Sequence, residues 1–237
     1  GHAISFAMPD QASEVRSIEP GHLVRCGHDV TVWNRTRLKA DTWTRTHGGH
    51  TADSPAQAAQ NADLVFTCVG NDDDVRIVTT GPHGVLTHMK PGSILVDHTT
   101  ASAELARELA AACAARGVGF VDAPVSGGQP GAVNGQLTVM CGGSDNDFAR
   151  AEPAIRCYAK ACLHMGPAGH GQLTKMVNQI CVAGVVAGLA EGMAFAERAG
   201  LDLQQVIDVI SKGAAQSWQM DNRHKTMIAS QYDHGFA

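Results

Sequence analysis

Apolar and polar positions alternate in short blocks along the first half of the chain. Each β-branched block is followed by polar or alanine-rich sequence, such as residues 102–116, which predicts a helix. Strands that alternate with helices in this way are typical of βαβ units and predict a parallel sheet. The predicted strands cover residues 28–33, 62–70, 92–98, 119–125 and 136–141.

The second half of the chain has a different pattern. Residues 173–199 form an unbroken run of good helix formers without proline, which predicts one long helix that ends at Gly200. A further helix is expected at 203–211, where Val206, Val209 and Ile210 recur at helical spacing. The pattern therefore predicts an α/β domain joined by a long helix to an all-helical domain.

Composition excludes several classes of protein. The 237 residues are 44% hydrophobic and 17% charged, as in an ordinary globular protein. The net charge is −5 and the 18 basic residues form no long run, so nucleic acid is not an expected partner. The longest apolar stretch, 180–190, is too short for a bilayer, and no signal peptide opens the chain, so neither membrane association nor export is expected.

Cysteine and histidine usage argues for a reducing compartment and against a metal site. Seven scattered cysteines, most of them within apolar stretches, suit buried free thiols, and the cytoplasm is the expected location. The twelve histidines include no HxxxH pair, and Cys157 and Cys162 lack a second cysteine pair, so no metal is expected.

A glycine-rich segment, DAPVSGGQPGA, follows the predicted strand that ends near residue 125. Its Ser126, Gly127 and Gly128 would expose backbone N–H groups at the carboxyl end of a strand, where open α/β sheets place their ligands. An anion such as the carboxylate of a small substrate would fit there. Taken alone, the glycines are more simply explained by a flexible hairpin loop.

A second glycine-rich segment, GPAGHGQLTKMVNQ, leads into the long helix. Lys175 shares one face of that helix with Asn178 and Gln179. Burial would lower the pKa of this lysine toward the range useful for proton transfer. The alternative is a lysine that reaches solvent near the start of the helix.

The segment VTVWNRT ends the strand that meets the adenosine ribose in dinucleotide-binding folds. An acidic residue there would bind the ribose hydroxyls of NAD, whereas Arg35 with Asn34 and Thr36 can hold a 2′-phosphate. The segment therefore favours NADP (NADPH) over NAD, although it could also be a simple turn.

Taken together, these motifs resemble the β-hydroxyacid dehydrogenase family, which includes 3-hydroxyisobutyrate dehydrogenase and several semialdehyde reductases. The matching stretches are GHDVTVWNRT, VDHTTAS, DAPVSGGQPGAVNGQLTVMCGG and GHGQLTKMVNQI. The resemblance implies a Rossmann-like doubly wound NADP-binding domain at 1–168 and a helical substrate and dimerisation domain at 169–237. It also implies hydride transfer between NADPH and a small 2- or 3-hydroxy acid, semialdehyde or keto acid.

The resemblance assigns roles to individual residues. Lys175 matches the family's catalytic lysine, and the Ser126–Gly128 segment matches its substrate-carboxylate loop. Thr100 matches the threonine near the nicotinamide, and Val69 with Gly70 takes the place of the family's Leu-Pro beside the cofactor. The substrate-binding amide is Asn178 or Gln179, with Asn178 slightly preferred.

The chain departs from the family pattern at both ends. Gln11, Ser13 and Arg16 stand where the family has the three glycines of its pyrophosphate loop. Either this stretch is extraneous or cofactor binding is weakened. The sequence stops at YDHGFA, before the family's Lys-Asp-Leu segment, so the helical domain is expected to be truncated.

Two rival functions remain to be weighed against a dehydrogenase. The related 6-phosphogluconate dehydrogenase has a glutamate seven residues after its lysine, where this chain has Val182, and it is discounted. A non-catalytic relative with a degraded phosphate loop would act as an interaction module. The long apolar helix further predicts a homodimer or homotetramer.

Overall fold

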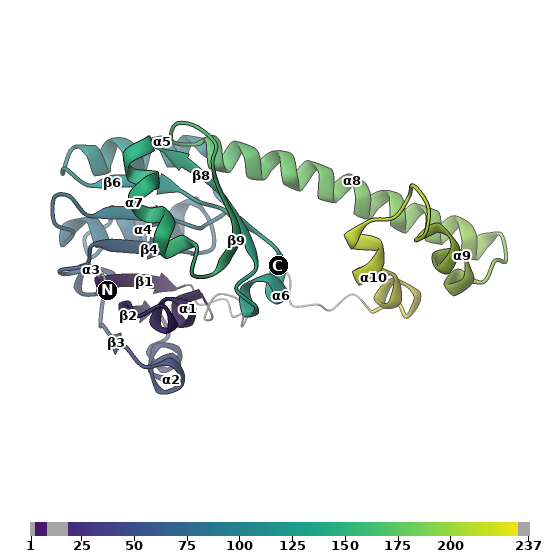
Figure 1. Cartoon of the computed structure of the whole chain (residues 1–237), viewed down its shortest axis with the longest axis horizontal. Helices are drawn as coiled ribbons and strands as arrows, with labels where there is room; N and C mark the ends of the chain where they lie inside the picture. The colour runs from purple at the N-terminus through teal and green to yellow at the C-terminus, as the bar shows by residue number, and fades with distance from the viewer. Residues whose placement is uncertain (1–2, 9–18, 232–237) are drawn as a thin grey trace. The chain divides into compact units, whose positions relative to one another are not determined.

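A computed structural model of the chain describes residues 3–8 and 19–231, which divide into two compact units at Lys175/Met176. The first unit is an α/β unit and the second is helical, as Figure 1 shows. The strands of the first unit are β1 (Ala3–Met8), β2 (Asp29–Asn34), β3 (His50–Thr51), β4 (Leu64–Thr67), β5 (Ile94–Asp97), β6 (Gly119–Asp122), β7 (Val125–Ser126), β8 (Leu137–Gly143) and β9 (Ala159–His164). Its helices are α1 (Glu19–Arg25), α2 (Arg37–His47), α3 (Pro55–Ala59), α4 (Asp72–Thr79), α5 (Ala103–Ala114), α6 (Gly128–Val133) and α7 (Asp145–Ile155), with a 3₁₀ turn at Val85–Thr87.

The strand order decides the fold class. Strands β3-β2-β1-β4-β5-β6 lie side by side in that order and are all parallel, while β8 runs antiparallel to β6 and also pairs with β7 and β9. An order of 3-2-1-4-5-6 is that of the Rossmann fold, whose ligand crevice opens where the order reverses, here between β1 and β4. The predicted α/β fold with a Rossmann-like sheet is confirmed.

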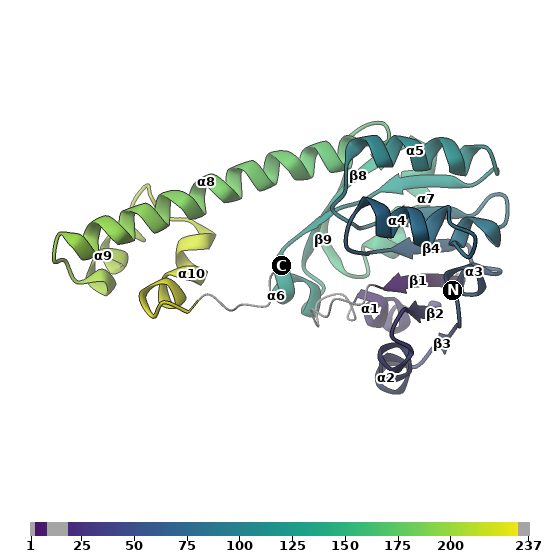
Figure 2. The same cartoon turned by 180° about the vertical axis from the view of Figure 1, so that it is seen from behind.

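Alternate residues of the central strands pack on opposite faces of the sheet. In β4, Leu64 and Phe66 belong to one buried cluster and Val65 to the other. Because side chains alternate along a strand, a fully buried strand needs a layer of helices on each face. Helices α1 and α7 pack on one face and α3, α4 and α5 on the other, with α7 toward the viewer in Figure 1 and α4 in Figure 2.

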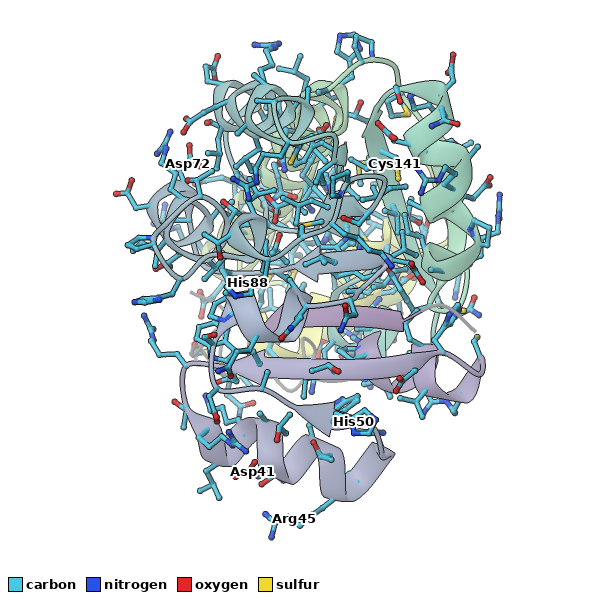
Figure 3. All side chains as sticks on the ribbon, turned by 90° about the vertical axis from the view of Figure 1, so that its left-hand side faces the viewer. Asp41, Arg45, His50, Asp72, His88 and Cys141 are labelled. Carbon is cyan, nitrogen blue, oxygen red and sulfur yellow. The ribbon has the colours of Figure 1, made fainter. Side chains whose placement is uncertain are left out.

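One edge of the sheet is closed by a short strand and a helix. Strand β3 has two residues and lies beside α2, where Figure 3 labels Asp41, Arg45 and His50. The guanidinium of Arg37 donates to Asp41 and to Asp53 and so ties α2 to the segment after β3. The short length of β3 leaves little unpaired backbone at this edge.

The sequence prediction missed some elements and merged others. Strand β1 lies between β2 and β4 in the sheet, although no strand was predicted for this opening stretch. Strand β9 and helix α7 were also not predicted. The predicted strand 119–125 is instead two strands, β6 and β7, because the chain passes at Ala123 and Pro124 from pairing with β5 to pairing with β8. Proline lacks the N–H group that a ladder requires.

The second unit has a small core of its own. Helix α8 (His170–Arg198) begins in the first unit and continues into the second, followed by α9 (Leu203–Ile210) and α10 (Trp218–Ile228). Leu189 and Met193 of α8 pack with Ile207 of α9 and Met220 of α10. Asp202 and Ser217 cap the two shorter helices, since their side chains accept N–H groups three residues later. The predicted long helix and helical second part are thus confirmed.

The cysteines are free thiols, but they are less uniformly buried than expected. Cys68, Cys113, Cys141 and Cys162 are buried, whereas Cys26 and Cys181 are exposed. The expectation of buried thiols is wrong for the latter two. Cys26 lies in the turn that follows α1, and Cys181 lies on an exposed stretch of α8.

Candidate functional site

The predicted site residues lie at one edge of the sheet. Strands β2, β4, β5 and β6 are parallel, so their carboxyl ends share an edge, which is where open α/β sheets bind ligands. Four predicted segments lie at these strand ends or shortly after them. They are Asn34–Thr36 at the end of β2, Val69–Gly70 after β4, Thr100 after β5 and Ser126–Gly128 at the end of the short β7 that follows β6.

The end of β2 presents a cation and no acid. The Oδ1 atom of buried Asn34 accepts the N–H of Thr36 at 2.8 Å, which turns the chain out of the strand. Arg35 and Thr36 are exposed after this turn. The guanidinium of the neighbouring Arg37 binds Asp41 and Asp53 within the unit.

A buried carboxyl group joins the ends of β4 and β5. The Oδ1 atom of Asp97 accepts the hydroxyl groups of Thr67 and Thr99 at 2.8 and 2.7 Å. The Thr99 hydroxyl in turn accepts the N–H of Val69 at 3.0 Å. Gly70 and Thr100, which come next in the two strands, are exposed. The network thus fixes the two predicted cofactor segments against each other.

The environment of Asp97 changes its acidity. Complete burial raises the pKa of this carboxyl to about 6, although the hydrogen bonds from Thr99 and Thr67 act in the opposite direction. Sequence analysis did not identify Asp97 or Thr99. The only signal was their position in VDHTT, three residues and one residue before Thr100, and their hydrogen bonds to the segment around β4 are not visible in one sequence.

His98 holds the backbone that leads into the Ser126–Gly128 segment. Its imidazole is fully buried, with Nδ1 2.6 Å from the Ala123 carbonyl and Nε2 2.6 Å from the Tyr158 hydroxyl. Burial lowers the pKa of His98 to about 4, so the ring is neutral at pH 7. A neutral ring can donate Nδ1–H to the carbonyl and accept the tyrosine hydroxyl at Nε2. His98 therefore braces the chain three residues before Ser126.

The Ser126 segment is a turn into a short helix that connects the antiparallel strands β7 and β8. Half-buried Ser126 ends β7, and α6 begins at Gly128. Gly127 and Gly128 have φ angles of +131° and +61°, which L side chains rarely adopt. The glycines are therefore required by the backbone path, whatever they bind.

Lys175 is buried and does not reach solvent at the start of the helix. Its side chain lies in the first unit and the residue is only 8% exposed. Burial lowers the pKa of the Lys175 ammonium group. The next two residues, Met176 and Val177, are exposed, so the burial of Lys175 comes from the packing of the helix start and not from its chain neighbours.

The two candidate amides follow Lys175 by less than a helical turn and a half. Asn178 is half-buried and Gln179 is exposed, and the Asn178 Nδ2 donates to the Gln179 Oε1 at 3.0 Å. Both stay candidates for the substrate amide. Gln11, Ser13 and Arg16, which stand at the positions of the pyrophosphate loop, lie outside the described residues.

Comparison with known proteins identifies the family. Residues 20–166 match the NAD-binding domain of 6-phosphogluconate dehydrogenase, and residues 169–237 match the NAD-binding domain of NADP-dependent 3-hydroxyisobutyrate dehydrogenase. An uncharacterised oxidoreductase of Shewanella frigidimarina is 62% identical over 92% of this chain and 75% of its own length. The chain belongs to the β-hydroxyacid dehydrogenase family.

Solved structures agree with this assignment. A 3-hydroxyisobutyrate dehydrogenase from Salmonella typhimurium is 30% identical, with a TM-score of 0.86 over 99% of this chain and 81% of that one. The Mycobacterium tuberculosis 3-hydroxyisobutyrate dehydrogenase is 31% identical, with a TM-score of 0.80 over 90% of this chain and 72% of that one. As a β-hydroxyacid dehydrogenase, the protein is an NAD(P)-dependent oxidoreductase that acts on CH–OH groups.

The described residues of this β-hydroxyacid dehydrogenase fit a nicotinamide dinucleotide. The reversal of strand order between β1 and β4 provides the crevice, and exposed Arg35 provides a cation at the end of β2. Gly70 lies exposed after β4, where a Cβ atom would come within 2.5 Å of the Asp74 carboxylate. Without a side chain at Gly70, the backbone after β4 is open to a ligand.

Helix α8 is longer than the apolar stretch recognised in the sequence. Its 29 residues are long and apolar enough, by length and composition alone, to cross a membrane. The apolar stretch 180–190 is too short by itself, but the complete helix also contains the small and apolar residues on either side of it. One such helix is weak evidence for a membrane span. Across the described ranges 3–8 and 19–231, no cluster of three His, Cys, Asp or Glu residues could hold a metal ion.

Proposed function

We propose that the protein interconverts a small 2- or 3-hydroxy acid and its semialdehyde or keto acid, with NADPH as the preferred cofactor. NADPH, when bound, supplies the hydride that reduces the carbonyl carbon. The observation that carries the proposal is the burial of Lys175 in a helix whose start is hydrogen-bonded to Asp122, the last residue of β6, four residues before Ser126.

Lys175 acts as the general acid and base. During reduction its ammonium group donates a proton to the developing alkoxide oxygen, and during oxidation the neutral amine accepts the proton of the hydroxyl group. The lowered pKa of Lys175 supports both directions, because a group that titrates closer to neutral pH is available in either form. Backbone N–H groups of Gly127 and Gly128, with the Ser126 hydroxyl, bind the substrate carboxylate. The amide of Asn178 or Gln179 orients the same substrate.

The cofactor preference rests on the end of β2. Exposed Arg35 with Asn34 and Thr36 suits the 2′-phosphate of NADPH, and no acidic side chain stands there to bind the free ribose hydroxyls of NADH. The family match over residues 169–237, to an NADP-dependent enzyme, supports the same preference. Val69, Gly70 and Thr100 line the nicotinamide side.

The substrate class, location and oligomeric state of the enzyme are also proposed. The homologous 3-hydroxyisobutyrate dehydrogenases make small carboxylate-bearing hydroxy acids the first substrates to test. The free thiols support a cytoplasmic location, and the exposed apolar face of α8 supports a homodimer or homotetramer rather than a membrane or nucleic-acid partner.

NADPH titration tests whether the protein is an enzyme or an interaction module. Trp33, Trp43 and Trp218 provide intrinsic fluorescence for the titration. A dehydrogenase binds NADPH and, with NADP⁺, oxidises at least one member of a panel that contains 3-hydroxyisobutyrate, L-threonate, glycolate and 4-hydroxybutyrate. A protein that binds neither NADPH nor NADH would overturn the proposal and leave the interaction module.

Substitution of Lys175 tests the mechanism. We expect Lys175→Ala to lower kcat by about 10²–10⁴-fold, the usual size of a proton-transfer contribution, with NADPH affinity nearly unchanged. Lys175→Arg is the matched control for charge, because arginine keeps the positive charge but does not release its proton near neutral pH. Both variants should lose turnover. If Lys175→Ala keeps more than about a tenth of kcat, another group is the proton donor.

A further inference from the structure

The first turn of α8 is capped by a carboxyl group from a distant part of the chain. The Gly169 carbonyl accepts the first N–H of the helix, from Leu173, so Gly169 is the N-cap residue and has no side chain to offer. Asp122, 47 residues earlier, takes this role at the end of β6. Its Oδ1 accepts the Gly169 N–H at 2.8 Å and its Oδ2 accepts the Gln172 N–H at 2.9 Å.

Glycines allow the helix and this carboxyl group to approach. A Cβ atom on Gly171 would lie 2.4 Å from the Met140 carbonyl oxygen and 2.6 Å from the Asp122 carbonyl oxygen. A Cβ atom on Gly142 would lie 2.5 Å from Oδ1 of Asp122. Only glycine fits at either place without a backbone shift. The start of α8 is therefore docked directly on the ends of β6 and β8.

Gln172 attaches the same helical turn to the segment around Thr100. The Gln172 side chain is buried, its Nε2 donates to the Thr99 carbonyl at 2.7 Å, and its Oε1 accepts the Ala101 N–H at 3.1 Å. These two groups flank Thr100. The turn that carries Gln172 is thus held both to β6 and to the loop after β5, and Lys175 follows it by three residues.

We propose that Asp122 is a positioning residue for Lys175. A helix is rigid over a single turn, so the two hydrogen bonds that fix Gly169 and Gln172 also fix the direction in which Lys175 projects. They also keep Lys175 out of solvent, since the first turn cannot fray away from the sheet. The inference rests on the proposed role of Lys175 as the general acid and base.

The Asp122→Asn substitution tests this role, because the amide retains one acceptor oxygen and turns an NH₂ group toward the other helix N–H. We expect kcat on the hydroxy acid to fall about tenfold to a hundredfold, as a misplaced catalytic group does, while the Kd for NADPH changes by less than about threefold. In a Lys175→Ala background the same substitution should lower kcat no further, since residues that act as one unit are not additive.

A second readout needs neither substrate nor cofactor. The rate at which an amine-specific acylating reagent labels Lys175, followed by peptide mass spectrometry across pH, reports the titration of this lysine. We expect the midpoint for Asp122→Asn to lie above that of the wild type, because a loosened helix start admits water to the ammonium group. Ser144→Ala, which removes the N-cap of α7 in the same unit, is the control. It should lower the melting temperature and move neither kcat nor the labelling midpoint.

The outcomes separate this inference from the proposed function. If Asp122→Asn keeps kcat within about twofold and leaves the midpoint in place, Asp122 serves stability alone, because the loss of a positioning contact costs far more. Additive losses in the double variant overturn the inference as well. If Lys175→Ala retains its kcat, the proposed mechanism fails irrespective of Asp122. Should Asp122→Asn not fold, Asp122→Ser, whose hydroxyl accepts one of the two N–H groups, gives the same comparison.

Discussion

Asp97 is a residue whose ionisation opposes folding. Its pKa is raised from 3.8 to about 6 by burial, so the folded protein holds this proton more tightly than the unfolded chain does. The stability that protonated Asp97 contributes is fully present below pH 3.8 and is lost as the pH rises through about 6. A shift of roughly two units corresponds to about 3 kcal/mol.

The Asp97→Asn variant should therefore be more stable than the wild type at high pH. Asparagine keeps an Oδ1 acceptor for the hydroxyls of Thr67 and Thr99 but cannot ionise. We expect its free energy of unfolding to exceed the wild-type value by up to about 3 kcal/mol at pH 8 and to approach it only as the pH falls below 3.8. Urea denaturation at three pH values measures the difference.

The difference between the two proteins is the informative quantity. Burial lowers the pKa of His98 to about 4, so the stability that neutral His98 contributes to the folded protein is lost as the pH falls. This pH dependence is opposite in sign to that of Asp97 in the wild-type protein. The contribution of His98 is common to both proteins and cancels on subtraction. A difference that is constant across pH, or a variant that is less stable at pH 8, would show that Asp97 is not a buried acid with a raised pKa.

Arg35 should decide the choice between NADPH and NADH. One charged hydrogen bond to the 2′-phosphate contributes about 1.5–3 kcal/mol, or on the order of tenfold to a hundredfold in kcat/KM. We expect Arg35→Ala to lose this factor with NADPH and to leave NADH unaffected. Arg37→Ala is the matched control, since that guanidinium binds Asp41 and Asp53. Equal use of both cofactors by the wild type, unchanged in Arg35→Ala, would contradict the assignment.

The environment of some residues could be predicted from the sequence and that of others could not. The burial of Lys175 could be expected because the residue follows a glycine-rich approach into an apolar helix, and the structure gives it 8% exposure. Asp97 and Asp122 could not be recognised. Their roles depend on partners 30 and 47 residues away, and no local pattern signals such a hydrogen bond. The catalytic and binding roles themselves stay predictions until the variants are measured.

At the scale of elements, buried strands were the easiest to predict. Strands β2, β4 and β5 are rich in apolar and β-branched residues and lie within the predicted ranges, apart from the last residue of β2. In β4 and β5 every residue is buried, as in a sheet covered on both faces. Strand β1 has the sequence AISFAM, with Ser5 and two alanines, which is a weak strand signal. Strand β9, AKACLH, is equally mixed, and only its pairing with β8 makes it a strand.

The docking of α8 on the sheet gives a prediction for Gly171. The Gly171→Ala substitution would put a methyl group 2.4 Å from the Met140 carbonyl, so the helix start or β8 must move. We expect a loss of about 1–3 kcal/mol in the free energy of unfolding, as for other overpacked sites. Gly188→Ala in the same helix has nothing within 4 Å and should cost nothing or add up to about 1 kcal/mol. Equal effects of the two substitutions would argue against the close approach.

At the scale of the whole molecule, the second unit exposes more apolar surface than a small helical unit can cover. Val177 and Ile180 of α8 are 62% and 73% exposed, and Phe195 of α8 and Val209 of α9 are each 72% exposed. Apolar side chains that are exposed singly are common, but repeated exposure along one helix is typical of an interface. The sequence predicted this from the composition of the helix, and the partner that covers it is proposed to be a second copy.

The oligomer prediction is tested by one pair of matched substitutions. We expect the purified protein to behave as a dimer or tetramer in multi-angle light scattering at micromolar concentration, because burial of this surface against a second copy removes it from water. Ile180→Glu should shift the population toward the monomer, since a carboxylate is costly to bury in an apolar interface. Ile77→Glu on α4 is the control, because Ile77 is 66% exposed but lies in the other unit. A monomeric wild type, or an equal response to the two substitutions, would mean that the apolar face of α8 is not where the copies meet.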